Sequence, residues 1–340
     1  MRLFFAGLIL GVGLAAGRAE EVVSRIAFGS CYKPEKSTSL WGKVAEYDPQ
    51  VWLWLGDNVY VDFINGEYVK ANLDPKAFEQ GYERLAKSEG VATLKNLPSV
   101  QVMATWDDHD YGLNDAGRNW ERKEEARKAF VKFWGGEDRA DGVYSSRDFG
   151  PEGKRVRVIL LDTRFNRDDP GPKGDILGPA QWKWLETEVL KPGADVLVIG
   201  SSIQVVAQNH PFEKWGNFPA SRERLYLLLG RSAAGQKILL SGDRHFGEIL
   251  RAPIQGKRPV FEITTSGLTE GYDPRWGTAW ASQKSLSPLR FKGIPDPNRV
   301  MDPFYGRNYG TIEISWDVQP PRITAKIRRE DGTMARQVDF

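Results

Sequence analysis

The sequence predicts an α/β fold, and two observations carry the prediction. Short apolar runs rich in β-branched residues recur between residues 26 and 240, and helix-like amphipathic stretches lie between them. This alternation of strand and helix is typical of proteins with a largely parallel sheet. With 340 residues, 41% of them hydrophobic, the chain is long enough to bury the core of one large domain.

The apolar runs predict strands that are buried on both faces, because they are nearly continuous rather than alternating. These strands span residues 26–28, 51–55, 100–104, 156–161, 196–199 and 238–240. Helices are predicted between them over residues 40–46, 75–87, 119–134, 179–190 and 221–229. We expect Asp74 to cap the second helix with Pro75 at its first position, and Ser221 to cap the last.

The pattern changes after Arg258, where strand-like segments follow one another without helices. Residues 260–263, 310–314 and 322–327 indicate a second, partly antiparallel sheet. Residues 268–304 are rich in Gly, Pro, Ser and Trp, which predicts a long surface loop. We expect residues 20–340 to form a single domain.

The first 19 residues are typical of a secretory signal peptide. Arg2 precedes an apolar run over residues 3–16, and small residues near Ala19 end the segment with an imperfect cleavage signal. An uncleaved anchor is the alternative, and a lipoprotein is disfavoured because no cysteine directly follows the run. No later segment approaches the roughly 20 apolar residues of a membrane helix. The net charge of +2, without a long basic run, gives no support for nucleic-acid binding.

Polar side chains follow each of the six predicted strands directly. In open α/β sheets, ligands bind at the carboxyl ends of strands, so these residues are expected to converge on one crevice. Two of the three histidines of the chain belong to this set. Its members are Cys31, Asp57, Tyr60, Asp108, His109, Arg164, Gln204, Asp243, Arg244 and His245.

Clustered carboxylates repel one another and are costly to bury, so the sequence predicts a metal site here. Carboxylate and phenolate oxygens favour hard ions, imidazole suits zinc or iron, and thiolate favours softer ions. A set containing Cys31, Asp57 and Tyr60 therefore indicates a borderline or ferric ion beside an oxygen-rich site. Two metal ions about 3.5–4 Å apart would suit the hydrolysis of a phosphoester.

Five motifs together resemble one family. They are residues 28–31 (FGSC), 56–60 (GDNVY), 106–110 (WDDHD), 161–164 (LDTR) and 241–245 (SGDRH). The residues of these motifs and their order along the chain are similar to those of the alkaline phosphatase D (PhoD-like) family of calcineurin-like metallophosphoesterases. The resemblance implies a four-layer α-β-β-α metallophosphatase sandwich, export, and hydrolysis of phosphomonoesters or phosphodiesters.

The resemblance also implies metal ligands. Cys31 and Tyr60 would bind Fe³⁺, and Asp57 would bridge to Ca²⁺, with Zn, Mn or Mg as alternative ions. Asp108 would be a ligand, and Asp243 and His245 would complete the metal set. Gln204 is an alternative ligand in place of a histidine of the wider superfamily. Asn114 and Asp115 either support the Asp108 loop or bind metal.

Three further residues are expected to act on the substrate. By the resemblance, His109 would lie beside the phosphate as an electrostatic stabiliser or leaving-group acid. Arg164 and Arg244 would clamp phosphate oxygens, the alternative being salt bridges to the neighbouring carboxylates. For His210, a place in a surface loop is favoured over a contact with substrate.

The predicted function is that of an exported, monomeric hydrolase of small-molecule or lipid phosphoesters, which uses a metal-activated water or oxo nucleophile. Phosphate monoesters and diesters both remain open as substrates, and a phospholipase D-like phosphodiesterase is an alternative. A cysteine-dependent hydrolase with His109 as base would leave the carboxylates unexplained. A non-catalytic, metal-stabilised binding protein of the cell envelope is the remaining alternative, supported by Trp276 and Trp280.

Overall fold

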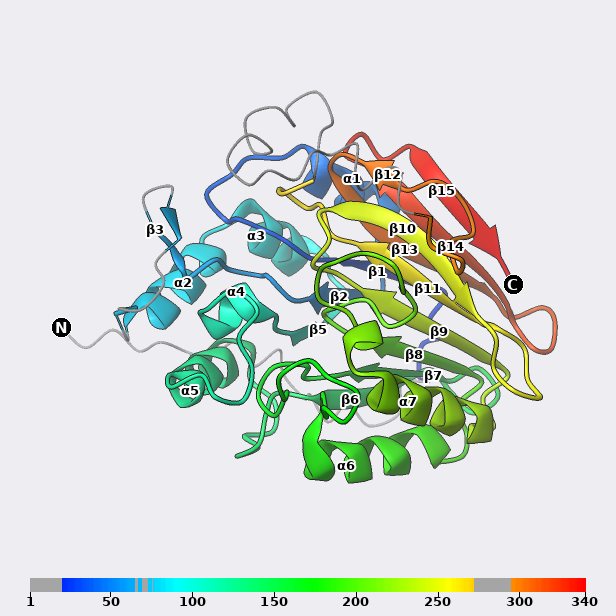
Figure 1. Ribbon diagram of the computed structural model, residues 1–340. Coiled ribbons are helices and arrows are strands. Elements are labelled where there is room, and N and C mark those ends of the chain that lie inside the picture. Colours follow the sequence, from blue (N-terminus) through cyan, green and yellow to red (C-terminus); the bar gives the residue numbers. More distant parts are fainter. Residues whose placement is uncertain (1–19, 65–66, 69–72, 75, 272–294) are drawn as a thin grey trace.

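Two β-sheets lie face to face between layers of helices, as the ribbon diagram in Figure 1 shows. The computed structural model describes residues 20–64, 67–68, 73–74, 76–271 and 295–340. The predicted signal peptide, Pro75, Trp276 and Trp280 lie outside the described residues. The architecture is the four-layer α-β-β-α sandwich that the resemblance implied.

The first sheet has the strand order β15-β14-β13-β1-β2-β5. Its strands β1, β2 and β5 are parallel, with Phe28 opposite Leu53 and Leu53 opposite Met103, and β5 forms one edge of the sheet. The three strands on the other side of β1 are antiparallel. The strands span Arg25–Gly29 (β1), Val51–Leu55 (β2), Gln101–Thr105 (β5), Asn308–Ser315 (β13), Arg322–Arg329 (β14) and Met334–Asp339 (β15).

The second sheet has the order β12-β10-β11-β9-β8-β7-β6. Its neighbouring strands β7, β8, β9 and β11 are parallel. The strands span Ser145–Phe149 (β6), Val156–Leu160 (β7), Val196–Gly200 (β8), Gln236–Ser241 (β9), Phe246–Ala252 (β10), Val260–Thr265 (β11) and Phe304–Tyr305 (β12). A separate small hairpin pairs β3 (Phe63–Ile64) with β4 (Glu67–Tyr68).

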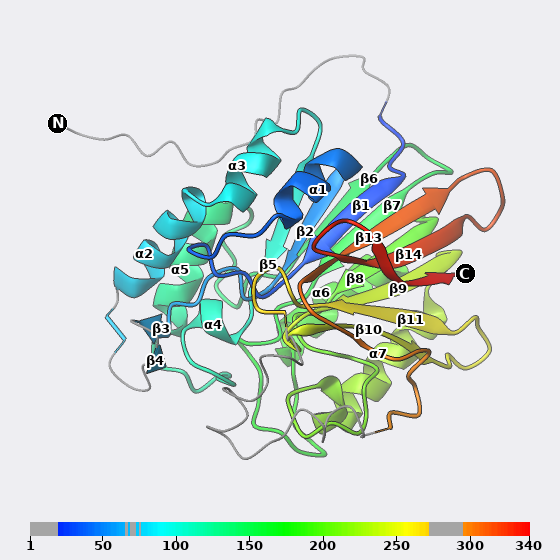
Figure 2. The same cartoon turned by 90° about the horizontal axis from the view of Figure 1, so that it is seen from above.

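Helices cover the outer face of each sheet. Seen from above in Figure 2, α1, α2 and α3 lie along one side of the molecule and α7 lies on the opposite side. The first group spans Leu40–Tyr47 (α1), Lys76–Ala86 (α2), Glu89–Asn96 (α3) and Lys123–Trp134 (α5). The second sheet is covered by Gly178–Leu190 (α6) and Pro219–Arg231 (α7). Two short elements complete the fold, α4 (Asp108–Tyr111) and the 3-10 turn η1 (Trp215–Asn217).

The apolar runs are continuous because the central strands have a core on each face. In β2, Leu53 belongs to the apolar cluster between the two sheets, whereas Trp52 and Trp54 pack with Trp41 of α1 under the helices. Leu239 of β9 likewise contacts the helical side of the second sheet. Full burial of an apolar side chain such as leucine stabilises the fold by about 1.5–3 kcal/mol relative to leaving it exposed.

The six predicted strands and five predicted helices are all present, with shifted ends. The helix predicted from residue 119 begins at Lys123, and Ser221 lies inside α7 rather than at its cap. The backbone N–H of Lys76 donates to the Asp74 carboxylate, as a cap would require. The strands after residue 258 do not form one sheet of their own: β11 joins β9 in parallel, and β13 pairs with β1.

Candidate metal centre

The loops after the parallel strands of both sheets meet at one edge of the sandwich. Gly56 has φ of 99°, and a Cβ there would lie 2.6 Å from Cβ of Asp107. A Cβ on Gly242 would lie 2.7 Å from Cβ of Ser30. Only glycine allows these close approaches, so the two glycines bring together loops from four different strands. The predicted convergence of strand ends therefore involves both sheets rather than one.

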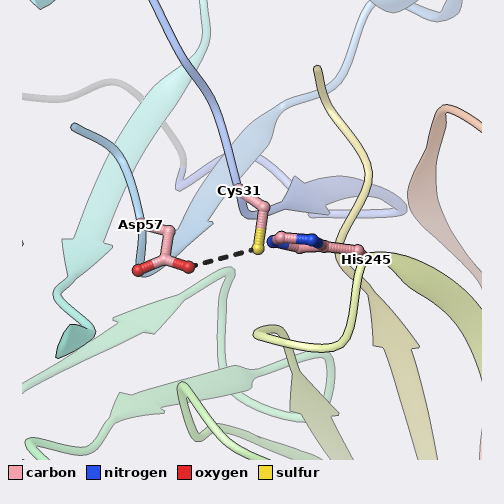
Figure 3. Close-up of side chains that lie close together, drawn as sticks. All are labelled: Cys31, Asp57 and His245. Atoms are coloured by element: carbon pink, nitrogen blue, oxygen red, sulfur yellow. Dashed lines mark hydrogen bonds between the residues drawn. The ribbon is translucent and has the colours of Figure 1, made fainter. Parts of the chain in front are cut away.

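Cys31, Asp57 and His245 form the first candidate ligand set, and their side chains point toward one another in Figure 3. One donor atom from each lies within 4.8 Å of the others. The Cys31 thiol donates to Oδ2 of Asp57 over 3.4 Å. Tyr60 adds a phenol oxygen 3.4 Å from the same Oδ2 and 3.4 Å from Nε2 of His245. Cys31, Asp57 and Tyr60 are the donors expected from the sequence at an iron site, and the structure brings His245 next to them.

A second set adjoins the first and shares a carboxylate with it. Asp57, Asp108 and His109 have ligand atoms within 4.8 Å of one another. Oδ2 of Asp108 accepts a hydrogen bond from the Asp115 backbone, whereas its Oδ1 is buried without a partner among the described residues. Asp108, Asp115 and Glu213 form a further overlapping set. A carboxylate shared between two sets is what a bridging ligand in a two-metal site requires.

Burial disfavours negative charge on several of these groups. It raises the pKa of Asp57, and the nearby Asp108 adds to the effect although His109 opposes it. It also raises the pKa of the Cys31 thiol and of the Tyr60 phenol, which Asp57 raises further. A bound cation would reverse these shifts. Together with the unpartnered Oδ1 of Asp108, they show that the residues present fit metal ions.

Two other candidate ligands have different surroundings. Burial lowers the pKa of His245 to about 4, so its ring is neutral near pH 7, as metal binding requires. Burial raises the pKa of Asp108, but His109 and Arg164 outweigh it and hold this pKa at about 2.

Asp243 is in none of the three sets formed by the described residues. Burial raises its pKa, against the opposing effect of Arg244.

The imidazole of His109 is held from three sides. Its Nδ1 lies 2.9 and 3.0 Å from the two carboxylate oxygens of Asp62, so Nδ1 carries a proton and donates it. The ring stacks on Tyr60 at 4.2 Å between centroids and on Tyr68 at 5.5 Å. Burial opposes protonation of His109, but Asp108 and Asp57 raise its pKa well above the usual value. The ring is therefore fixed in place and favours the cationic form.

The two arginines predicted to clamp phosphate lie in different environments. Arg164 is fully buried, with Nε 2.6 Å from Oδ1 of Asp107 and Nη1 2.7 Å from Oε2 of Glu213. Its guanidinium is therefore engaged by protein carboxylates. Arg244 is 3.9 Å from the carboxylate of Asp243, and its Nε is buried without a partner among the described residues.

Three weaker candidates are also placed. Gln204 is buried, and its amide donates to Glu248 over 2.8 Å; it belongs to none of the ligand sets found among the described residues. Asn114 is exposed, whereas Asp115 joins the third set. His210 is half-buried and lines a hollow with Arg244, so it is not a plain surface residue.

Sequence reasoning missed Asp62, Tyr68, Glu213 and Lys33. Lys33 is buried, forms an ion pair with Glu270 at 3.1 Å, and has its Nζ 4.6 Å from the Tyr60 ring centroid. Asp62 lies in the same loop as Asp57, so a signal was available there. Lys33 likewise follows Cys31 by two residues, whereas Tyr68 and Glu213 reach the site through contacts between distant segments, for which the sequence carries no local signal.

The ligand loops also share an unusual backbone conformation. Cys31, Asp57, Asp115, Asp243 and His245 all have φ between 50° and 68°, in the left-handed region that non-glycine residues seldom adopt. Such conformations persist where the surrounding structure holds them, and they concentrate at functional sites. Four of these five residues, all but Asp243, also belong to the ligand sets.

Solved structures with this architecture include several phosphatases. A structure titled "Structure of PhoD" has a TM-score of 0.68 at 18% identity, covering 94% of this chain and 72% of that one. Purple acid phosphatase PPD1 from yellow lupin (Lupinus luteus) seeds has a TM-score of 0.62 at 14% identity, covering 94% and 54%. GAP50, described as the anchor in the inner membrane complex of Plasmodium, has a TM-score of 0.58 at 12% identity, covering 94% and 89%. At these identities the likeness shows the fold.

The amino-acid sequence identifies the family more directly. A search of curated proteins gives no match to this chain. The family described as PhoD-like phosphatase matches residues 26–317, which is most of the chain and includes all five motifs. This protein therefore belongs to the PhoD-like phosphatase family and is a phosphoric ester hydrolase.

Proposed function

We propose that this hydrolase depends on two kinds of metal ion. Cys31, Asp57, Tyr60 and His245 would hold Fe³⁺, and Asp57, Asp108 and Asp243 would hold Ca²⁺, with Zn, Mn or Mg as alternatives. The observation that carries the proposal is the position of Asp57, which is shared by two adjoining ligand sets. The thiolate and phenolate on one side favour a ferric ion, and the oxygen-rich side favours a hard divalent ion.

When bound, such ions polarise the phosphoryl group and activate the attacking water. The protein's own residues would handle the leaving group. Asp62 holds the Nδ1 proton of His109, and the stacked rings of Tyr60 and Tyr68 fix the plane of the imidazole. The other nitrogen, Nε2, would then donate a proton to the departing oxygen from the imidazolium form, which Asp62, not one of the proposed metal ligands, favours.

The two arginines take different parts in this proposal. Arg244 would meet anionic oxygens of the substrate, because its buried guanidinium lacks a close carboxylate partner. Arg164 would act indirectly, by fixing Asp107 next to the ligand Asp108. A buried cation between two carboxylates is a positioning element rather than a group offered to substrate.

We propose phosphate monoesters and diesters as the substrate class, and a monomeric protein of one domain over residues 20–340, exported through a signal peptide in residues 1–19. Among the described residues, none of the helices is both long and apolar enough for a membrane span. A phospholipase D-like activity on lipid phosphodiesters is the alternative. N-terminal sequencing of protein recovered outside the cytoplasm tests the cleavage near Ala19.

The decisive experiment combines elemental analysis, a visible absorption spectrum and ester hydrolysis. We expect iron and calcium in the purified protein, a tyrosinate charge-transfer band, and turnover of p-nitrophenyl phosphate or bis-p-nitrophenyl phosphate. A phosphatidylcholine assay tests the lipid alternative. Chelation should remove the activity, and adding the metals back should restore it. Full activity in metal-free protein would refute metal dependence, and it is the result expected of a cysteine-dependent hydrolase.

A further inference from the structure

A small hollow with a cavity volume of about 20 Å³ lies beside the metal centre and opens in part to solvent. It contains none of the proposed metal ligands, but Arg244, which lines it, sits between Asp243 and His245 in the same loop. Phe246 and Glu248 follow Arg244 on β10, and the other lining residues come from distant segments: His210, Asp296, Arg299 and Tyr305. The hollow is therefore an extension of the site rather than the site itself.

Arg244 brings a buried cation to this hollow. Its side chain is only 8% exposed, and its guanidinium carbon lies 4.3 Å from the ring centroid of Phe212 and 5.4 Å from that of Phe246. The carboxylate of Asp243 is 3.9 Å away, too far for a strong charged hydrogen bond. Nε of Arg244 has no partner among the described residues. A buried cation in this state favours an anionic ligand.

His210 contributes a second donor, and its tautomer follows from its contacts. The backbone N–H of Phe212 donates to Nδ1 of His210 over 3.2 Å, so Nδ1 is unprotonated. Burial, with Arg244 and Lys214 nearby, lowers the pKa of His210 to about 2, and the ring is neutral. The proton of the neutral ring must then be on Nε2, which is buried and without a partner among the described residues.

The acidic residues of the hollow have donors of their own, so they do not occupy Arg244 Nε or His210 Nε2–H. Glu248 accepts hydrogen bonds from Nε of Arg299 on one oxygen, over 2.6 Å, and from the Gln204 amide on the other, over 2.8 Å. Asp296 accepts three backbone N–H groups, from Gln208, Asn209 and Asn298. Nε of Arg244 and Nε2 of His210 have no partner among the described residues, so these two donors are available to a ligand.

We propose that this hollow binds an oxyanion carried by the leaving group, so that the preferred substrate is a phosphoester whose alcohol part bears a second acidic group, a carboxylate or a phosphate. Arg244 and His210 Nε2–H hold that group, while the aromatic rings of Phe246 and Tyr305 form the apolar wall. This inference rests on the proposed function, because it names the substrate class of the same centre.

The test uses matched pairs of esters on the metal-loaded protein. Phosphoglycolate is compared with ethyl phosphate, which replaces the carboxylate by a methyl group. Glycol bisphosphate is compared with glycol monophosphate, so that the two pairs distinguish a carboxylate from a phosphate. The quantity measured is the ratio of kcat/KM within each pair, together with the ratio of Kd by calorimetry, which does not need turnover.

We expect wild type to favour the doubly acidic member of at least one pair by about tenfold or more, the effect of a hydrogen bond to a charged group. His210→Phe keeps a ring but removes the donor, and should reduce that ratio about tenfold. His210→Gln keeps an N–H donor and should retain most of the preference.

Two results would overturn the inference while leaving the proposed function intact. One is that wild type has the same kcat/KM and the same Kd for both members of each pair. The other is an unchanged ratio in His210→Phe, which would place the histidine outside the subsite. Absence of turnover on all four esters and on p-nitrophenyl phosphate would instead refute the proposed function, and the Kd ratios would still decide whether the hollow binds an oxyanion.

Discussion

Replacing Asp57 by asparagine removes the charge that both ligand sets share while keeping the shape of the side chain. Asp57 is 1% exposed, and three donors surround its carboxylate: the Cys31 thiol, the Tyr60 hydroxyl and the His109 backbone N–H. Each lies at 3.4 Å, beyond the usual hydrogen-bond distance. Because burial raises the pKa of this carboxyl, the charge destabilises the metal-free fold at neutral pH. The metal-free variant should therefore be at least as stable as metal-free wild type.

With metal bound, wild type should be more stable than Asp57→Asn. An ion held at a thousand times its Kd stabilises the folded state by about 4 kcal/mol, so two ions give about 8 kcal/mol. For a protein of this size, 1 kcal/mol shifts Tm by roughly 2 °C, which predicts a rise of about 15 °C in wild type. Asp57→Asn should lose most of that rise. Loss of several kcal/mol of charge stabilisation should also reduce kcat/KM by about a thousandfold or more.

Thermal unfolding with and without chelator, elemental analysis and hydrolysis of p-nitrophenyl phosphate measure these effects. Asp48→Asn is the matched control, because Asp48 has a similar φ of 51° but is exposed, pairs with Arg25, and lies at the end of α1. An Asp57→Asn protein that keeps both metals and a rate within tenfold of wild type would refute the shared-ligand assignment. A metal-free variant far less stable than metal-free wild type would show that Asp57 acts as a structural residue.

Three further substitutions probe separate parts of the structure. Cys31→Ser should lose iron and the visible band while retaining calcium, because the thiolate is the softest donor of the first set; elemental analysis and absorption measure this. Arg164→Gln should destabilise the protein by about 3–5 kcal/mol in urea unfolding, because two buried carboxylates lose their cation. Glu262 has a pKa raised by burial to about 7, so the folded state binds its proton more tightly than the unfolded state. Wild-type stability should fall by up to about 3 kcal/mol as pH rises from about 4.5 to 7, and Glu262→Gln should remove that part of the slope in urea unfolding at each pH.

Each of these has a clear contrary result. Full iron and full activity in Cys31→Ser would refute the ferric assignment. Arg118→Gln is the control for Arg164→Gln: Arg118 is 52% exposed and pairs with Asp168, so its loss should cost no more than about 1 kcal/mol. Equal losses in the two arginine variants would contradict the argument from burial. Parallel pH profiles for wild type and Glu262→Gln would show that another group titrates in that range.

The central strands could be predicted from the sequence because they are buried on both faces. The run Val51–Leu55 has no polar position, since its odd and even residues face two different cores. By contrast, β6 and β15 were missed, because they lie at sheet edges and carry polar residues such as Arg147 and Arg336. The pairing of β11 with β9, and of β13 with β1, joins strands that are distant in the sequence, and no local pattern encodes it.

The same limit applies to the candidate site. Residues that directly follow a buried strand, such as Cys31 and Asp57, were found because chain position and chemical type coincide. Glu213 lies in a loop between β8 and α7, and only the fold brings it to Arg164 and Asp115. Tyr68 reaches His109 from a small hairpin with no apolar run to predict it. The sequence therefore identifies ligands better than the residues that hold them.

The left-handed backbone of the ligand loops has a consequence for mutagenesis and for design. Outside glycine, this conformation costs an L-residue roughly 1–2 kcal/mol, and asparagine and aspartate tolerate it best. An alanine scan across Cys31, Asp57, Asp243 and His245 would therefore combine the loss of a ligand with a change in backbone preference, and would misstate the contribution of the side chain. A transplant of these four side chains to another scaffold would likewise need turns that impose a positive φ at each of the four positions.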